Sequence, residues 1–331
     1  MKVAVSLGLA GIRRGPVAVA KSVYSVLKAC AWVADRGPFD HILAYWGSYA
    51  TTCAIAFHQL TDPTAPVTMF LHRADLYQQP NSMRLKLLYV DNVIVVCDFN
   101  RRYIQDNYGD IYDRVLPKIH CHHPSLDVSG MPFLESGRPP ASLLAVGRLH
   151  QGKGFDDLLR AIALLRNRSW NVQAELVGDG PERNALARLA RRLRIETAVR
   201  FRGWLPFDEV QRAMMKATVL VHPSAPFGDA VPTVIKEAMA LGTPVVASSV
   251  AGIPELLDGG RCGVLVPPRR PESLADAIAI LLGDLPRLRR LAYDARGFAE
   301  ANFDLWRNGR RLADILRSTP PRTPVAQEHE S

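Results

Sequence analysis

The chain lacks the marks of membrane-spanning and of disulfide-bonded proteins. None of its apolar runs approaches the roughly 18 residues that a membrane-spanning helix needs. Its five cysteines, Cys30, Cys53, Cys97, Cys121 and Cys262, are scattered over 331 residues, which is typical of reduced thiols. The opening MKVAVSLGLAG is too short and too weakly flanked to resemble a secretion signal. We therefore expect a protein of the cytoplasm.

Acidic side chains are the minority among the charged residues. With 41 Lys and Arg against 32 Asp and Glu, the net charge is +9, which suits a nucleic acid, an anionic membrane surface or a phosphorylated ligand. No zinc-finger, RNA-recognition or helix-turn-helix signature is present, so we do not expect a nucleic acid partner. Many arginines gather in residues 182–194, where leucines recur at helical spacing, and a solvated helix face accounts for them.

Apolar, β-branched runs alternate with helical patterns through almost the whole chain. This alternation predicts an α/β fold with parallel sheets. A stretch rich in Pro and Gly at residues 134–142 interrupts it and places a boundary between a domain at 1–138 and a domain at 139–317. Residues 318–331 lack periodicity and predict a disordered tail. The predicted strands cover residues 41–47, 66–72, 92–97, 118–123, 142–147, 171–178, 199–203, 218–224 and 244–248.

A glycine-rich loop with two cations follows the first strand of the second domain. In VGRLHQGKGFDDLL, Gly147 ends the strand, and Arg148 and Lys153 precede the next helix. Arginine offers a planar fork of donors and lysine a mobile point charge, which together suit a diphosphate. A surface turn with two solvated cations fits the same residues equally well.

Two carboxylates flank a helix start in DAVPTVIKEAMALG. Asp229 lies in the loop, and Glu237 lies about one turn inside a helix that Gly242 ends. The free amides of Thr233 and Val234 suit a phosphate or a sugar hydroxyl, and two carboxylates suit the hydroxyls of a ribose or hexose. The helix dipole also favours acids at this end, by ~0.3–1 kcal/mol each.

These segments, together with AELVGDGPERNAL, RFRGWLP and AGIPELL, resemble the nucleotide-sugar domain of retaining glycosyltransferases of family 4. The resemblance spans residues 143–282 and implies the GT-B fold, in which two Rossmann-like, doubly wound domains face a central cleft. It implies a hexosyltransferase that moves a sugar from a UDP- or GDP-linked donor to an acceptor hydroxyl with retention of configuration. It also implies that no metal or other cofactor is required.

The resemblance implies a role for each matching residue. Arg148 and Lys153 would bind the diphosphate and stabilise the leaving group, Glu237 would hold the ribose hydroxyls, and Asp229 would contact the donor sugar. Aspartate stands at 229 where the family usually has glutamate, so its carboxylate lies roughly 1.5 Å further back. The donor sugar would then be seated differently, or the site weakened. The other implied donor contacts are Gly147, Arg202, Gly203, Ala230, Val231 and Thr233.

The amino-terminal half resembles the family less closely. APVTMFLHRADLY would make His72 the cleft histidine with Asp75 beside it, although a structural histidine at a strand end also fits. VVCDFNRRYI places Arg101 and Arg102 at a helix start, as acceptor or phosphate contacts or as a solvated face. Adjacent residues in HCHH point to opposite faces of a strand, so we expect no metal site there. Only about forty residues precede the strand at 41–47, so this domain is unusually short.

The sequence thus predicts a metal-independent retaining glycosyltransferase of cell-envelope, exopolysaccharide or lipopolysaccharide synthesis. The expected acceptor is a saccharide or lipid-linked saccharide, and the helix around KSVYSVLKACAWVA would rest on anionic lipid at the inner face of the membrane. Two alternatives stay open. One is a GT-B binding or partner protein that is inactive or truncated, and the other is a sugar-nucleotide epimerase or hydrolase on the same fold.

Overall fold

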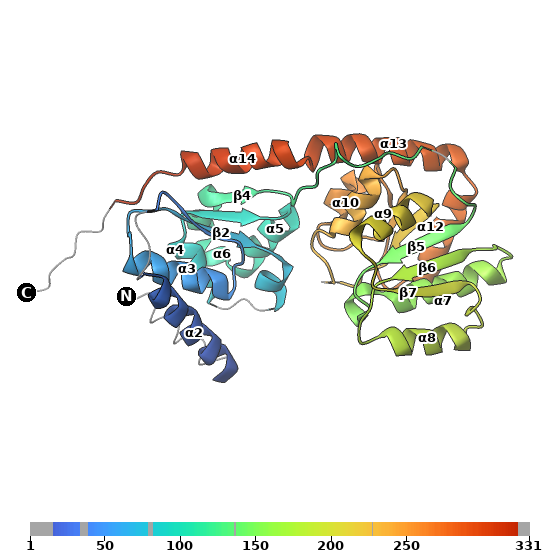
Figure 1. Ribbon diagram of the computed structural model, residues 1–331, viewed down its shortest axis with the longest axis horizontal. Helices are drawn as coiled ribbons and strands as arrows, with labels where there is room; N and C mark the ends of the chain where they lie inside the picture. The colour runs from blue at the N-terminus through green and yellow to red at the C-terminus, as the bar shows by residue number, and fades with distance from the viewer. Residues whose placement is uncertain (1–15, 34–38, 79–81, 136, 227, 324–331) are drawn as a thin grey trace, which may run out of the picture. The chain divides into compact units, whose positions relative to one another are not determined.

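The computed structural model describes residues 16–33, 39–78, 82–135, 137–226 and 228–323 (Figure 1). The chain divides into two compact units, and each is described by itself. Unit 1 comprises residues 1–122 and 309–331, and unit 2 comprises residues 123–308. The opening segment MKVAVSLGLAG lies outside the described residues.

Unit 1 alternates strands and helices along the chain. Its strands are β1 (Ile42–Ala44), β2 (Val67–Leu71), β3 (Asn92–Val95) and β4 (Ile119–Cys121). Its helices are α2 (Pro16–Val33), α3 (Tyr49–Leu60), the π-helical turn η2 (Ala74–Gln78), α4 (Met83–Tyr89), α5 (Asp98–Asn107), α6 (Gly109–Val115) and the 3-10 turn η3 (Leu116–Lys118). The last helix, α14 (Leu305–Ser318), begins in unit 2 and ends in unit 1.

The four strands of unit 1 form a parallel sheet in chain order, β1-β2-β3-β4. Right-handed crossovers between successive neighbours place the connecting helices on one face of such a sheet. Figure 1 shows α3, α4 and α6 together on one side of β2 and β4. Alternate residues of β2 and β3 are buried against α4, α5 and α6, and this contact forms the main core of the unit.

Unit 2 repeats the same alternation with more strands. Its strands are β5 (Ser142–Val146), β6 (Gln173–Val177), β7 (Val199–Gly203), β8 (Val219–His222), β9 (Val245–Ser248) and β10 (Val264–Val266). Its helices are η4 (Gln151–Lys153), α7 (Phe155–Asn167), α8 (Arg183–Arg192), α9 (Phe207–Lys216), α10 (Thr233–Ala240), α11 (Ile253–Leu256), η5 (Asp258–Gly260), α12 (Pro271–Leu282) and α13 (Leu285–Asn302).

The sheet of unit 2 is doubly wound, with the order β10-β9-β8-β5-β6-β7 and all pairs parallel. Leu143 and Ala145 of β5 pack against α7 and α12, and Leu144 packs on the opposite face with α10 and α13. The central strand is therefore buried on both faces, which explains its continuously apolar sequence. Helix α10 ends before Gly242, whose φ of +72° is the left-handed conformation that ends helices.

The division between the units falls at His122/His123, whereas the sequence placed a boundary at 138/139. The intervening segment packs on unit 2: Val128 and Met131 are buried in its core, and Leu126 N donates to Phe303 O at 2.8 Å. Apolar side chains before the Pro- and Gly-rich stretch therefore attach this segment to the second unit.

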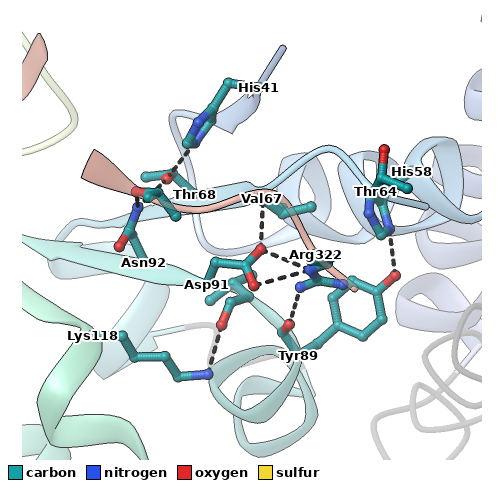
Figure 2. Close-up of polar contacts among 12 residues, drawn as sticks. His41, His58, Thr64, Val67, Thr68, Tyr89, Asp91, Asn92, Lys118 and Arg322 are labelled. Atoms are coloured by element: carbon teal, nitrogen blue, oxygen red, sulfur yellow. Dashed lines mark hydrogen bonds and ion pairs between the residues drawn. The ribbon is translucent and has the colours of Figure 1, made fainter. Parts of the chain in front are cut away.

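Residues 318–323 pack on unit 1, although the sequence predicted a disordered tail from residue 318. Arg322 Nε donates to both carboxylate oxygens of Asp91, at 3.0 and 2.8 Å, and its guanidinium lies 4.5 Å from the centre of the Tyr89 ring (Figure 2). Thr319 Oγ1 accepts a hydrogen bond of 2.6 Å from Asn92 Nδ2. These contacts tie the segment to the start of β3, so the prediction was wrong for residues 318–323; residues 324–331 lie outside the described part.

Replacing Arg322 tests this attachment. Arg322→Ala leaves Asp91 without its cation and should lower the free energy of unfolding of unit 1 by about 1–3 kcal/mol. Arg317→Ala is the matched control, because Arg317 and its partner Asp314 are 79% and 76% exposed, and it should cost less than about 0.5 kcal/mol. Chemical denaturation, with hydrogen exchange of peptides covering β2 and β3, measures the stability of both variants. Equal losses of unfolding free energy in Arg322→Ala and Arg317→Ala would contradict the contact.

Candidate functional site

Two loops meet at the carboxyl edge of the unit 2 sheet, where the strand order reverses. From β5 the chain places β6 and β7 on one side and β8, β9 and β10 on the other. The loops after β5 and β8 therefore border the crevice in which doubly wound sheets bind ligands. Ala225 N donates to Gly152 O at 3.0 Å, and a Cβ on Gly228 would lie only 1.9 Å from the same oxygen. Glycine at 228 permits this approach.

The approach of the loops brings together four polar side chains. Lys153 Nζ donates to Asp229 Oδ1 at 2.5 Å, and His222 Nε2 lies 2.9 Å from Asp229 Oδ2. The Ser224 hydroxyl donates to the same Oδ2. The Lys153, Asp229 and His222 side chains are only 20%, 13% and 4% exposed. The structure thus joins two predicted site residues, Lys153 and Asp229.

The charge of Asp229 is set by its donors. Burial alone would raise the pKa of Asp229, but the hydrogen bond and charge of His222 and the charge of Lys153 outweigh it and hold the pKa well below its usual range. The carboxylate is therefore ionised at neutral pH and balances the ammonium group of Lys153. An anionic ligand that reaches Lys153 competes with Asp229 for that group.

Gly147 and Arg148 begin the loop that carries Lys153. Gly147 N donates to Val177 O at 2.9 Å, and a Cβ on Gly147 would lie 3.8 Å from Lys153 Cε, so the lysine stem passes close to the glycine. Arg148 is exposed and has no ion-pair partner in the part of the chain that the structure describes. Its guanidinium is therefore available to a ligand at this edge.

The second predicted acid lies on α10. Glu237 is half-buried, one turn after the exposed Thr233 at the helix start. Burial raises the pKa of Glu237, and the charge of Lys236 partly offsets this effect. Within the described residues, no hydrogen bond or ion pair joins Glu237 to Asp229.

Two further predicted donor contacts lie between Asp229 and α10. Ala230 is buried, and its carbonyl accepts a hydrogen bond of 3.0 Å from Gly252 N, which brings the loop after β9 against this segment. Val231 is partly buried and packs on the core that α10 and α13 share. Both residues therefore fix the path of the chain beside Asp229.

The two predicted residues at the end of β7 have different surroundings. Gly203 O accepts a hydrogen bond of 2.7 Å from Gly178 N, so Gly203 lies at the same edge as the loop after β6. Arg202 Nη1 instead donates to Glu175 Oε2 at 2.8 Å. The Arg202 side chain lines a cavity of about 500 Å³ together with Ser142, the first residue of β5. The structure does not join it to Lys153.

His72 and Asp75 lie in unit 1 and contact each other. His72 directly follows β2, and its Nε2 is 3.1 Å from Tyr45 O. Burial lowers the pKa of His72, and the charge of Asp75 with the bond to Tyr45 partly offsets the effect. Asp75 Oδ2 accepts from the His72 backbone N at 2.9 Å. The structure confirms that the two are neighbours at a strand end, and their roles stay predictions.

Arg101 and Arg102 lie exposed near the start of α5. Arg101 Nη2 pairs with Asp98 Oδ1 at 2.9 Å, one turn earlier on the same helix. The buried neighbour Asn100 donates instead to Leu71 O at 3.2 Å and so ties α5 to the end of β2. Contact of the two arginines with an acceptor or a phosphate stays a prediction.

The sequence analysis did not identify His222 and Ser224 as site residues. Both are buried, at or just after the carboxyl end of β8. The available signal was a buried apolar strand, TVLV, that ends in polar residues directly before a loop with a predicted site carboxylate. Polar side chains in that position point toward the ligand edge of a parallel sheet.

Comparison with known proteins relates the second unit to a family. Residues 140–284 match the family described as "Glycosyl transferases group 1". This part of the chain, most of unit 2, therefore resembles the group 1 glycosyltransferases. A glycogen synthase of Mycobacterium tuberculosis is 29% identical to it over 264 residues, which cover 76% of this chain and 62% of that protein. The chain spans about three fifths of the length of the first curated relatives that it matches.

Solved glycosyltransferase structures share the fold of this chain. Sucrose-phosphate synthase from Thermosynechococcus elongatus superimposes with a TM-score of 0.75 at 21% identity, over 88% of this chain and 76% of that one. The Anabaena protein HepE in complex with UDP-glucose gives 0.74 at 23% identity, over 88% and 82%. The predicted GT-B fold class, with two parallel α/β sheets, is confirmed.

The low pKa of Asp229 predicts a pH-dependent effect of its replacement. Asp229→Asn leaves Lys153 without its counter-ion and should lower the free energy of unfolding by about 1–3 kcal/mol at pH 7. Because the folded pKa is depressed, the carboxylate contributes fully above its ordinary pKa of about 3.9 and loses this contribution as the pH falls toward the folded pKa. The gap between wild type and variant should therefore narrow below about pH 4.

Urea unfolding at pH 7, 4 and 3 measures this gap. Asp276→Asn is the control, because Asp276 pairs with Arg168 on the surface and its side chain is 56% exposed. It should change the unfolding free energy by less than about 0.5 kcal/mol at each pH. A gap for Asp229→Asn that stays constant down to pH 3 would contradict the assigned charge.

Proposed function

We propose that the protein transfers a sugar from a nucleotide diphosphate donor to a hydroxyl of a saccharide acceptor. The observation that carries the proposal is the Lys153 ammonium group, held by Asp229 at the point where the strand order of unit 2 reverses. The match of residues 140–284 to the group 1 glycosyltransferases supports it. The bound UDP-glucose of the Anabaena protein, which has the same fold, supports a nucleotide sugar as the donor.

In the proposed reaction the bond between the anomeric carbon and the β-phosphate oxygen breaks while the acceptor oxygen bonds the anomeric carbon on the same face. The acceptor proton moves to the departing phosphate oxygen, so the configuration is retained. Lys153 and Arg148 stabilise the charge that develops on the diphosphate, as fixed cations do most effectively in a partly dehydrated site. The proposal assigns this charge stabilisation to the two side chains and not to a metal ion.

Donor binding would also change the state of Asp229. A phosphate oxygen that takes Lys153 Nζ releases Asp229 Oδ1, which then accepts a hydroxyl of the donor sugar. His222 and Ser224 continue to hold Oδ2. Glu237, one turn into α10, would hold the ribose hydroxyls. The shorter aspartate thus keeps a defined position because two side chains fix its second oxygen.

Release of nucleoside diphosphate tests the proposal. The purified protein is incubated with a panel of UDP- and GDP-linked sugars, with and without a membrane extract as the source of acceptor. Release that depends on the extract supports transfer and identifies the donor. Release without any acceptor would favour the hydrolase or epimerase, and no release from any donor would favour an inactive relative.

Lys153→Ala should lower turnover by about 100-fold or more, because it removes the cation that stabilises the leaving group. The loss of turnover should far exceed the change in thermal stability. Lys216→Ala, which removes an exposed lysine at the end of α9, is the control and should leave turnover unchanged. Unchanged turnover in Lys153→Ala would contradict the assigned role.

Helix α2 gives a specific observation in favour of a membrane surface as a further partner. Its outward residues include Val17, Tyr24, Leu27 and Trp32, all more than half exposed. The buried residues of its inward face have small side chains instead, such as Ser22, whose hydroxyl donates a hydrogen bond to a carbonyl of its own helix. Large apolar side chains rarely gather outward on a helix that contacts only water.

The charge of α2 favours anionic lipid. Its sequence carries Lys21 and Lys28 and no acidic residue. A cationic helix with exposed Tyr, Leu and Trp suits the interface of an anionic bilayer. No helix in the described part of the chain is long and apolar enough to cross a bilayer. We propose peripheral binding at the inner face of the membrane, with a lipid-linked saccharide of cell-envelope synthesis as the acceptor.

Flotation with phosphatidylcholine vesicles that contain phosphatidylglycerol tests the membrane proposal. The wild type should float at low salt and not at high salt, because the attraction is partly electrostatic. Leu27→Glu combined with Trp32→Glu should abolish flotation, whereas Ile280→Glu, at an exposed apolar position on α12, should not. A wild type that stays with the aqueous fraction at low salt would remove the proposal.

A further inference from the structure

Three rings gather at the carboxyl edge of the unit 1 sheet. Tyr45 and Trp46 directly follow β1 and are 53% and 47% exposed. His72 follows the neighbouring parallel strand β2, and its ring centroid lies 5.1 Å from that of Tyr45 and 4.5 Å from that of Trp46. The carboxyl edge is the side on which parallel α/β sheets bind ligands.

The loop that carries the two exposed rings is fixed from within. Lys86 is fully buried, and its Nζ donates to Gly47 O at 3.0 Å and to Ser48 O. Thr51 Oγ1 donates to Trp46 O at 2.7 Å. A change in the loop conformation would remove these two acceptors from a buried ammonium group, which is costly. The rings are therefore presented to solvent in a preorganised arrangement.

The three ring side chains also carry polar atoms without protein partners among the described residues. The Tyr45 hydroxyl, the Trp46 indole N–H and His72 Nδ1 make no hydrogen bond to any residue that the structure describes. Asp75 Oδ2 accepts from His72 N, but its Oδ1 is buried and has no partner among the same residues. Because Asp75 Oδ1 is itself buried, the atoms left for a ligand on the exposed rings are those of Tyr45, Trp46 and His72.

We propose that Tyr45, Trp46 and His72 form a platform that binds a pyranose ring by stacking. A pyranose has C–H groups on its faces, which aromatic rings bury, and hydroxyls on its rim, which the polar atoms of the platform can bond. A lipid tail would cover the rings and leave those polar atoms unpaired, so the mixed chemistry favours a saccharide. The identification of this saccharide as the acceptor rests on the proposed transferase function. The binding of a saccharide to the platform does not depend on that function.

Saturation-transfer NMR detects such binding with simple probes. The probes are methyl α-D-glucopyranoside, methyl α-D-mannopyranoside and maltotriose. Cyclohexanol, an apolar ring with a single hydroxyl, is the comparison compound. We expect saturation of the sugar C–H protons in the wild type. Trp46→Ala should bind about 2- to 12-fold more weakly, the range for loss of one aromatic partner. Trp46→Phe keeps an aromatic face and should retain most of the binding, which separates stacking from folding.

Trp306→Ala is the matched control, because Trp306 on α14 is 66% exposed and belongs to no ring cluster at the sheet edge. Its glycoside signal should equal that of the wild type. The platform would be overturned if Trp46→Ala and Trp306→Ala gave equal glycoside signals, or if cyclohexanol gave the same signal as the glycosides. It would also be overturned if a protein that does transfer sugar gave no glycoside signal. Glycoside binding without donor turnover would instead support the platform and contradict the proposed function.

Discussion

The ion pair between Lys153 and Asp229 is the contact on which the account of unit 2 depends. It joins loops that follow two adjacent strands, β5 and β8, on either side of the point where the strand order reverses. The contact needs backbone loops that nearly touch, which glycine at 228 allows. It also holds a partly dehydrated cation at the sheet edge, where Asp229 balances its charge, and the proposed diphosphate would compete with Asp229 for it.

The position of Asp229 follows from its other partners. An aspartate reaches less far than the glutamate that the resemblance to family 4 glycosyltransferases implies at this position, and an unsupported carboxylate there would be poorly placed. His222 and Ser224 hold its Oδ2 and leave Oδ1 to exchange between Lys153 and a ligand. Unit 1 uses the same structural location differently, since its strand ends carry exposed rings in place of charges. The two proposed ligand sites thus both lie at the carboxyl edge of a parallel sheet and differ in their chemistry.

Most of the fold and part of the site could be predicted from the sequence. Strand-like runs in the sequence identified β1 to β9, whereas β10 (Val264–Val266) was missed. Motif spacing placed Lys153 and Asp229 in ligand-facing loops, yet their direct contact joins residues far apart in the chain and requires the strand order. His222 and Ser224 were not predicted as site residues, because a histidine at a strand end has many structural uses. Arg322 docks through one side chain in a Pro-rich segment, which carries no periodic signal.

The structure of the protein with UDP or GDP bound tests the central claim most directly, because it shows where a diphosphate lies and what Lys153 then contacts. The account predicts that Lys153 Nζ leaves Asp229 Oδ1 and bonds a phosphate oxygen at the edge between β5 and β8, while His222 keeps its bond to Asp229 Oδ2. A nucleotide bound elsewhere, with the Lys153–Asp229 pair intact, would contradict it.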